Sequence, residues 1–311
     1  MPARESFPLR KRLCVAIALA LGQTSAAVAQ DAPLFPDAGS PQMRVATIGY
    51  RLAAANRQRC PRVEPLTGLL LHDLGSYASA LRQQIAAGYG LANSVGVLGV
   101  VAGSAAAEAG LRSGDEIRAL DDKPLVLPSV GPSASYDGIA AFTDLLVERL
   151  AHGDVPLTIM RAGEPLTVTM PRRDGCAARV ALLPGRRPDA WSDGRYAAVT
   201  QALAEAASDD ELAFALGHEM AHVVLGHAAE PHGALTGIGI GGKRSRERER
   251  EADRWGITMS LAAGYDEVGA ERLLDRLAQA HASGLSLTHP SVRARVAAIR
   301  EAAAAFSSES R

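Results

Sequence analysis

The sequence predicts an α+β protein in which a β-rich region precedes a mainly helical region with a small edge sheet. The β-rich region is indicated by residues 94–101, which are rich in valine and glycine, and by a hairpin pattern at 157–160 and 166–170. The helical region is indicated by an apolar helix that begins at Ser208. With 311 residues and 47% hydrophobic content, the chain can form one large domain or two smaller ones.

The N-terminus has the pattern of a signal peptide over residues 1–29. Three basic residues at 10–12 precede an apolar run at 13–22, and Ala-Val-Ala at 27–29 matches a cleavage site, with Gln30 as the mature start. An uncleaved membrane anchor is the alternative. No later segment is long and apolar enough to span a membrane, so we expect a soluble protein that is periplasmic or secreted.

The net charge and the cysteine content further restrict the class of protein. A protein that binds nucleic acid carries an excess of positive charge, whereas the net charge of this chain is −1. Removal of the signal peptide leaves Cys60 and Cys176. An even number of cysteines in an exported chain predicts a disulfide bond between them, with two free thiols as the alternative.

Residues 30–85 are expected to form a linker and an N-terminal helical segment. Prolines mark residues 30–42 as the linker. The spacing of apolar residues predicts helices at 43–56 and 78–87, with a short strand at 67–72 between them.

Residues 103–124 contain glycines, an alanine pair and a Gly-Asp pair in a regular order. They predict a short helix at 104–110 and a turn at Gly114-Asp115 that leads into a strand. With a further helix at 139–151 and the hairpin, residues 86–172 resemble a bacterial PDZ domain.

The resemblance to PDZ domains implies a peptide ligand, which such domains bind by adding a strand to a sheet edge. The ligand loop would lie at the glycine-bearing entry to the first strand, around Val95–Leu98, although the sequence has no plain GLGF pattern there. A fixed spacer and a lid over the helical region are the alternatives.

The sequence His-Glu-Met-Ala-His begins at His218. Residues four apart lie on one face of a helix, so His218 and His222 can bind one metal ion. Glu219 is then placed to deprotonate a water molecule. Ser208 and Glu211 form a predicted capping box, which puts the motif on a helix. Two histidines on an ordinary helix are the alternative.

Four other histidines are poor candidates for the third ligand that a catalytic zinc needs. Leu225 and Ala228 exclude the HExxHxxGxxH class. His227 is half a turn around the helix from His218, so it is expected to point away as a surface residue. Ordinary surface or loop positions are expected for three others: His72, His152 and His232.

The charged stretch 245–256 supplies a better candidate. Glu249 shares a helical face with small or apolar residues suited to packing against another helix, namely Ala252, Gly256, Met259 and Ala263. Glu247 instead shares a face with residues expected to be exposed, Glu251, Arg254 and Thr258. Glu249 is therefore the candidate ligand, and Asp253 could accept a hydrogen bond from a ligand histidine.

HExxH followed by Glu-Arg-Glu-Ala-Asp at 249–253 resembles zinc metallopeptidase family forty-eight, gluzincins of the HtpX and CaaX-protease type. The resemblance covers 179–300, and we place the metallopeptidase domain at 177–305. It implies zinc ligands at His218, His222 and Glu249, a general base at Glu219 and a matching aspartate at Asp253.

Two further segments resemble elements of the same family. Residues 191–200, predicted as a turn followed by a strand, resemble its edge strand, with which an extended substrate can pair. Residues 288–295 resemble its THPxxxxR element, which implies that His289 is an extra metal ligand or a contact in the transition state. A histidine at a helix start before Pro290 is the alternative. The glycine-rich residues 233–242 are expected to form a loop that gates the cleft.

Together these patterns predict an exported zinc-dependent endopeptidase that holds one Zn²⁺ per chain and cleaves envelope or unfolded proteins. The PDZ-like domain would recruit substrates or regulate the enzyme. The alternative is a PDZ-based envelope adaptor or chaperone-like protein, whose metal site is dormant or blocked by His289.

Overall fold

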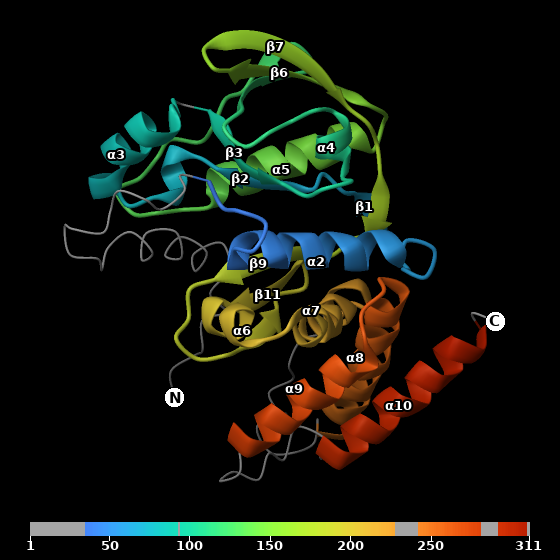
Figure 1. Cartoon of the computed structure of the whole chain (residues 1–311). Helices are drawn as coiled ribbons and strands as arrows, with labels where there is room; N and C mark the ends of the chain where they lie inside the picture. Colours follow the sequence, from blue (N-terminus) through green and yellow to red (C-terminus); the bar gives the residue numbers. More distant parts are fainter. Residues whose placement is uncertain (1–34, 93, 228–241, 281–291, 310–311) are drawn as a thin grey trace. The chain divides into compact units, whose positions relative to one another are not determined.

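The computed structural model describes residues 35–92, 94–227, 242–280 and 292–309 (Figure 1). The predicted signal peptide, His232, His289 and nearly all of the predicted gating loop lie outside these residues. Helices and antiparallel sheets are both present, which confirms the α+β class. The chain divides into two compact units. Unit 1 comprises residues 1–50, 64–174 and 182–184, and unit 2 comprises residues 51–63, 175–181 and 185–311.

Unit 1 contains a mainly antiparallel sheet in the order β2-β3-β4-β6-β7, with β5 paired to β4. Its strands are β2 (Leu69–His72), β3 (Val95–Val100), β4 (Glu116–Leu120), β5 (Lys123–Pro124), β6 (Val155–Arg161) and β7 (Glu164–Met170). Its helices are η3 (Leu74–Ser76), α3 (Ser79–Tyr89), α4 (Ala105–Glu108) and α5 (Asp137–Leu150). A fully buried aliphatic core joins α5 to the sheet through Val95, Ile117, Ile139, Leu146, Leu157 and Ile159. A further helix, α2 (Pro41–Ala55), has its first ten residues in unit 1.

The Gly-Asp pair has a structural role in unit 1. Gly114 adopts a left-handed conformation with φ of 89°, which glycine tolerates without strain. Asp115 is buried and accepts hydrogen bonds of 2.7 Å from both Nε and Nη2 of Arg161, and one of 2.8 Å from the backbone N–H of Arg112. Because a buried carboxylate needs such partners, Asp115 fixes the turn to strand β6.

The ligand loop predicted around Val95–Leu98 is wrong, because these residues belong to strand β3. Strand β3 lies in the interior of the sheet, where Gly96 pairs with His72 of β2 on one side and with Glu116 of β4 on the other. The first residues of β3 are therefore paired on both sides and have no backbone groups left for an added peptide strand. The edge strands of this sheet are β2 and β7.

His72 is buried, which corrects the prediction of a surface histidine. Its side chain is 1% exposed, and Nδ1 lies 2.8 Å from the hydroxyl of Tyr77. Gly96 on the neighbouring strand makes room for the ring, because a Cβ there would lie 2.4 Å from His72 Nε2. Burial lowers the pKa of His72 to about 4, so the ring is neutral at pH 7.

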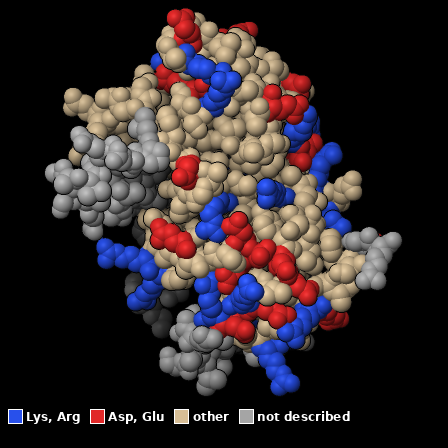
Figure 2. Space-filling model, viewed as in Figure 1, with Lys and Arg blue, Asp and Glu red and all other residues tan. Residues whose placement is uncertain are grey.

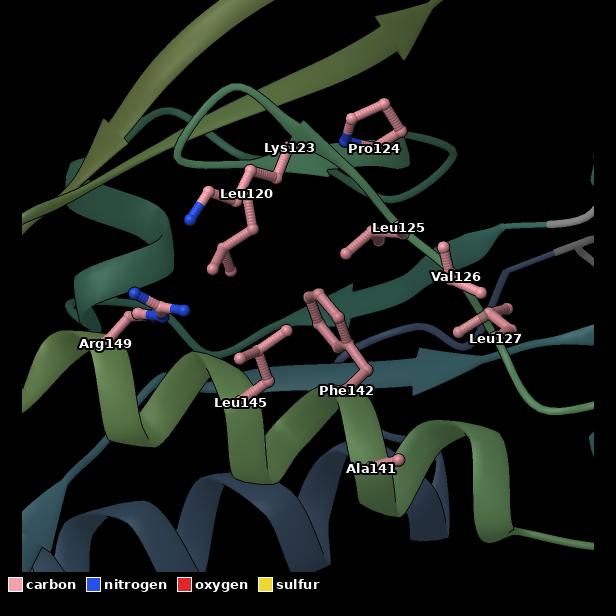
Figure 3. A pocket seen from close by; sticks show the side chains of 10 residues that line it. All are labelled: Leu120, Lys123, Pro124, Leu125, Val126, Leu127, Ala141, Phe142, Leu145 and Arg149. Carbon is pink, nitrogen blue, oxygen red and sulfur yellow. The ribbon is translucent and has the colours of Figure 1, made fainter.

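A cavity of about 300 Å³ lies between α5 and the segment that follows β4 (Figure 3). Leu120, Phe142 and Leu145 form much of its apolar lining, and Lys123 and Arg149 add two cations. The cavity therefore combines an apolar lining with positive charge.

Unit 2 combines a three-stranded sheet in the order β10-β11-β9 with five helices among the described residues. The strands are β9 (Arg179–Leu183), whose last two residues are assigned to unit 1, β10 (Ala190–Ser192) and β11 (Tyr196–Thr200). The helices are α6 (Gln201–Ala206), α7 (Asp209–Val224), α8 (Gly242–Ala262), α9 (Glu267–Ala280) and α10 (Val292–Glu309). The predicted turn and strand at 191–200 form a hairpin instead, in which Trp191 pairs with Ala198. Strand β10 is thus one edge of the described sheet and β9 the other, whereas β11 lies in the middle.

Cys60 and Cys176, both in unit 2, form the predicted disulfide bond. Two short strands, β1 (Val63–Pro65) and β8 (Asp174–Cys176), pair next to it in the sequence. Buried Asn56 donates hydrogen bonds to the backbone oxygens of Leu52 and Met259, at 2.9 and 3.0 Å. The segment before Cys60 is thereby attached to α8.

The surface shown in Figure 2 carries acidic and basic side chains interspersed with one another. This mixture agrees with the net charge of −1. Across the described parts of the chain, every helix is too short or too polar to span a bilayer.

Candidate metal centre

Helix α7 carries the HExxH motif and begins at the predicted capping box. Ser208 Oγ accepts a hydrogen bond from the backbone N–H of Glu211, and the Glu211 carboxylate accepts one from the backbone N–H of Ser208. These two bonds satisfy donors that a helix start otherwise leaves free. Most of α7 is buried, so the orientation of His218 and His222 is fixed by packing.

Helices α7 and α8 meet through glycines next to the motif. A Cβ on Gly217 would lie 2.9 Å from the backbone oxygen of Gly256, which is closer than real Cβ atoms approach. The two helices can therefore pack at this distance only because both residues are glycine. On the face of α8 that carries Glu249 and Gly256, Ala252 and Met259 are fully buried. Glu247 lies on a different face and is exposed. The predicted packing face of α8 is therefore confirmed, and it brings Glu249 to α7.

The structure brings His218, His222 and Glu249 together, with one potential ligand atom from each within 4.8 Å of the others. The two Nε2 atoms are 3.2 Å apart. Glu249 Oε2 lies 3.6 Å from His218 Nε2, and Oε1 lies 3.6 Å from His222 Nε2. Tetrahedral zinc with bonds of about 2.0–2.2 Å separates its ligand atoms by about 3.3–3.6 Å. The donor set and its spacing therefore fit a zinc ion.

The charges around these histidines also favour a cation. Burial opposes protonation of His218, but the carboxylates of Asp253 and Glu249 outweigh it and raise the pKa of His218 to about 9. Burial, together with the adjacent His218, lowers the pKa of His222 to about 3. His218 is therefore the histidine of the pair that favours positive charge, whereas His222 is neutral at pH 7.

Asp253 contacts the proposed ligand His218, as predicted from the position of Asp253 on the helical face of Glu249. Its Oδ1 lies 3.0 Å from His218 Nδ1, although the angle departs from that of a good hydrogen bond. Arg295 holds Asp253 from the other side with hydrogen bonds of 2.8 and 2.6 Å. Burial alone would raise the pKa of Asp253, but Arg295 and His218 hold it below the usual range. Sequence reasoning missed this role of Arg295, which lies at the end of the THPxxxxR element.

Glu219 is half-buried and lies outside the three-residue ligand cluster. Burial raises the pKa of its carboxyl group, and nearby His218 opposes that shift. The side chain of Ser192, on edge strand β10, hydrogen-bonds to Glu219. Ser192 was not singled out by the sequence, because its contact with Glu219 depends on the packing of the hairpin.

His227 does not point away from the motif, which corrects a second prediction. Its side chain is 9% exposed, and its Nδ1 lies 2.9 Å from Nδ1 of His222. An uninterrupted helix would carry His227 away from His218, but α7 ends at Val224 and Gly226 turns the chain back with φ of 72°. No helical pattern would have revealed this contact.

A mainly helical unit with two histidines and a glutamate at zinc spacing defines a metallopeptidase-like centre. Residues 177–236 and 232–303 match the sequence profile of peptidase family M48. The match is confined to residues 177–303 and supports a zinc metallopeptidase of this family, and therefore a hydrolase. No curated protein sequence matches the chain.

Among solved structures, the chain is similar to the HtrA3 PDZ domain bound to a phage-derived ligand (FGRWV). The sequence identity is 16%, and the match covers 36% of this chain and 89% of that chain, with a TM-score of 0.27. A TM-score of this size does not establish a shared fold. The PDZ-like assignment of residues 86–172 rests on the sequence motif and on the elements found in unit 1.

Proposed function

We propose that the protein is an exported zinc-dependent endopeptidase that hydrolyses peptide bonds in envelope or unfolded proteins. One Zn²⁺ per chain would be held by His218, His222 and Glu249, in a metallopeptidase domain at 177–305. The observation that carries the proposal is the convergence of these three donors beside Glu219. When bound, zinc would polarise the carbonyl of the scissile bond and lower the pKa of water.

Glu219 is proposed as the general base and then the general acid. Its carboxylate would take a proton from the attacking water, whose oxygen bonds to the carbonyl carbon. The same proton would pass to the leaving amine as the carbon–nitrogen bond breaks. A pKa raised by burial suits a group that must both accept and return a proton.

Edge strand β10 supports the choice of an extended polypeptide as substrate. Its outer side is not paired with another strand of the described sheet, and Ser192 on β10 contacts Glu219. A peptide added along β10 would therefore run beside the proposed base. Export is supported by the signal-peptide pattern at 1–29 and by the disulfide bond, which persists in oxidising compartments.

Residues 86–172 are proposed as a PDZ-like domain that recruits substrates or regulates the enzyme. The interior position of β3 moves any strand addition to an edge of the sheet, of which β2 is one. His289 is proposed as a contact near the metal on the strength of the family resemblance alone.

The test is cleavage of a chemically unfolded protein by the purified zinc-loaded enzyme, with and without a chelator. We expect chelator-sensitive fragments from the wild type and a loss of about 10²-fold or more in rate for Glu219→Gln, which still binds zinc. Glu247→Gln, an exposed carboxylate on α8, is the control and should cleave normally. Cleavage retained by Glu219→Gln would contradict the assignment. Binding without fragments, insensitive to chelator, would indicate the adaptor function instead.

A further inference from the structure

A histidine and a carboxylate lie behind His222, on the side of its ring opposite the ligand atom. His222 Nδ1 lies 2.9 Å from His227 Nδ1, and His227 Nε2 lies 3.3 Å from Glu251 Oε2. The backbone fixes this arrangement, because the N–H of His227 donates to the oxygen of His222 at 3.0 Å. The three side chains form a line from the proposed metal site to the surface.

The chemistry of imidazole allows one arrangement of protons along this line. Two bare nitrogens at 2.9 Å would repel each other, so either His222 Nδ1 or His227 Nδ1 carries a proton. His222 Nε2 must be bare to bind a metal, which puts the proton of the neutral ring on His222 Nδ1. His227 Nδ1 is then the acceptor, and the proton of His227 lies on Nε2, which faces Glu251.

We propose that His227 and Glu251 are positioning residues that hold His222 in the orientation and tautomer needed to bind the metal ion. The inference rests on the proposed role of His222 as a zinc ligand. Both histidines of the motif would then be supported by a carboxylate on α8. Asp253 contacts His218 directly, whereas Glu251 reaches His222 through His227.

The difference in burial between His227 and Glu251 predicts which of them contributes more to zinc binding. The side chain of His227 is 9% exposed, whereas that of Glu251 is 50% exposed and interacts with water. Removal of a group that orients a metal ligand weakens metal binding by about 10- to 100-fold. We expect His227→Leu to weaken zinc binding by this amount, and Glu251→Gln to weaken it by less.

The experiment measures zinc affinity of the full-length protein by competition with a chromophoric chelator, and the visible spectrum of the cobalt-substituted protein. His227→Leu removes the acceptor, while His227→Asn keeps an oxygen near the position of Nδ1. Glu247→Gln, exposed on the same helix, controls for the loss of one negative charge. Thermal unfolding of each metal-free variant reports whether the fold is retained.

We expect His227→Leu to lose affinity and to change the cobalt spectrum, His227→Asn to recover most of the affinity, and Glu247→Gln to match the wild type. Wild-type affinity and spectrum in His227→Leu would overturn the proposal. Equal weakening in His227→Leu and His227→Asn would also overturn it, because packing rather than a hydrogen bond would then be responsible. If the wild type binds no zinc, the proposed metal site itself fails, which is a different outcome.

Discussion

The contact between α7 and α8 at Gly217 and Gly256 predicts that Gly256→Ala damages the metal site. A Cβ on Gly256 would lie 2.8 Å from the backbone nitrogen of His218 and 3.0 Å from its Cα. Ordinary contacts of a Cβ atom begin at 3.4 Å, so the two helices must separate by about 0.5 Å at this point. The atoms that obstruct the new methyl group belong to the backbone, which cannot rotate away as a side chain could.

Two opposing effects decide the stability of Gly256→Ala. Alanine in a helix interior is favoured over glycine by about 1 kcal/mol. Overpacking of a tight contact costs about 1–3 kcal/mol. The free energy of unfolding should therefore fall by about 0–2 kcal/mol. Metal ligation is more demanding, since ligand distances must hold within about 0.2 Å. A separation of about 0.5 Å between the helices that carry His218 and Glu249 should weaken zinc binding by about 10- to 100-fold.

Zinc affinity and urea unfolding of the metal-free protein measure the two effects separately. Gly131→Ala provides the matched control, because a Cβ there meets no atom within 4 Å and its φ is not left-handed. This control should leave zinc affinity unchanged. A Gly256→Ala protein that binds zinc as tightly as the wild type would refute the reasoning, because the helices would then have absorbed the methyl group without moving the ligands.

Two further predictions concern buried ionisable groups. Arg295→Met removes one of the two cations beside fully buried Asp253, the other being His218, and should lower the free energy of unfolding of the metal-free protein by about 3 kcal/mol; an unchanged urea midpoint would contradict this. His72 titrates near 6.5 when unfolded and near 4 when folded, so its contribution to stability is complete above pH 6.5 and is lost, by about 3 kcal/mol, as the pH falls to 4. His72→Asn should remove that pH dependence, and the control His152→Asn, at an exposed position, should retain it. If the free energy of unfolding, measured in urea, changed equally with pH in both variants, His72 would not be responsible.

Local patterns predicted the elements around the candidate site well. The capping box at Ser208 is formed, and helical phase correctly separated the buried face of α8 from its exposed face. Glu249 could be selected from a run of four acidic residues because most of the later residues on its face of the helix are small or apolar. Periodicity carries this information directly, since packing against another helix requires one apolar face.

Contacts that depend on chain reversal or strand pairing could not be predicted. His227 approaches His222 only because α7 ends at Val224 and the chain reverses at Gly226, and helical periodicity does not say in which direction the chain continues after a helix end. The interior position of β3 follows from long-range pairing, which the Val-Gly pattern of that strand does not encode. His72 was placed at the surface because nothing nearby in sequence reveals that Gly96 makes room for its ring.

The disulfide bond between Cys60 and Cys176 closes a loop with a sequence separation of 116, which includes all the described strands of the sheet of unit 1. A peptide bond cut anywhere inside that loop leaves both fragments covalently joined. A cut within the loop, whether by another protease or by the enzyme itself, would therefore not release the regions on either side of the loop from each other. Such a nicked molecule would migrate as one chain in a non-reducing gel and as two after reduction.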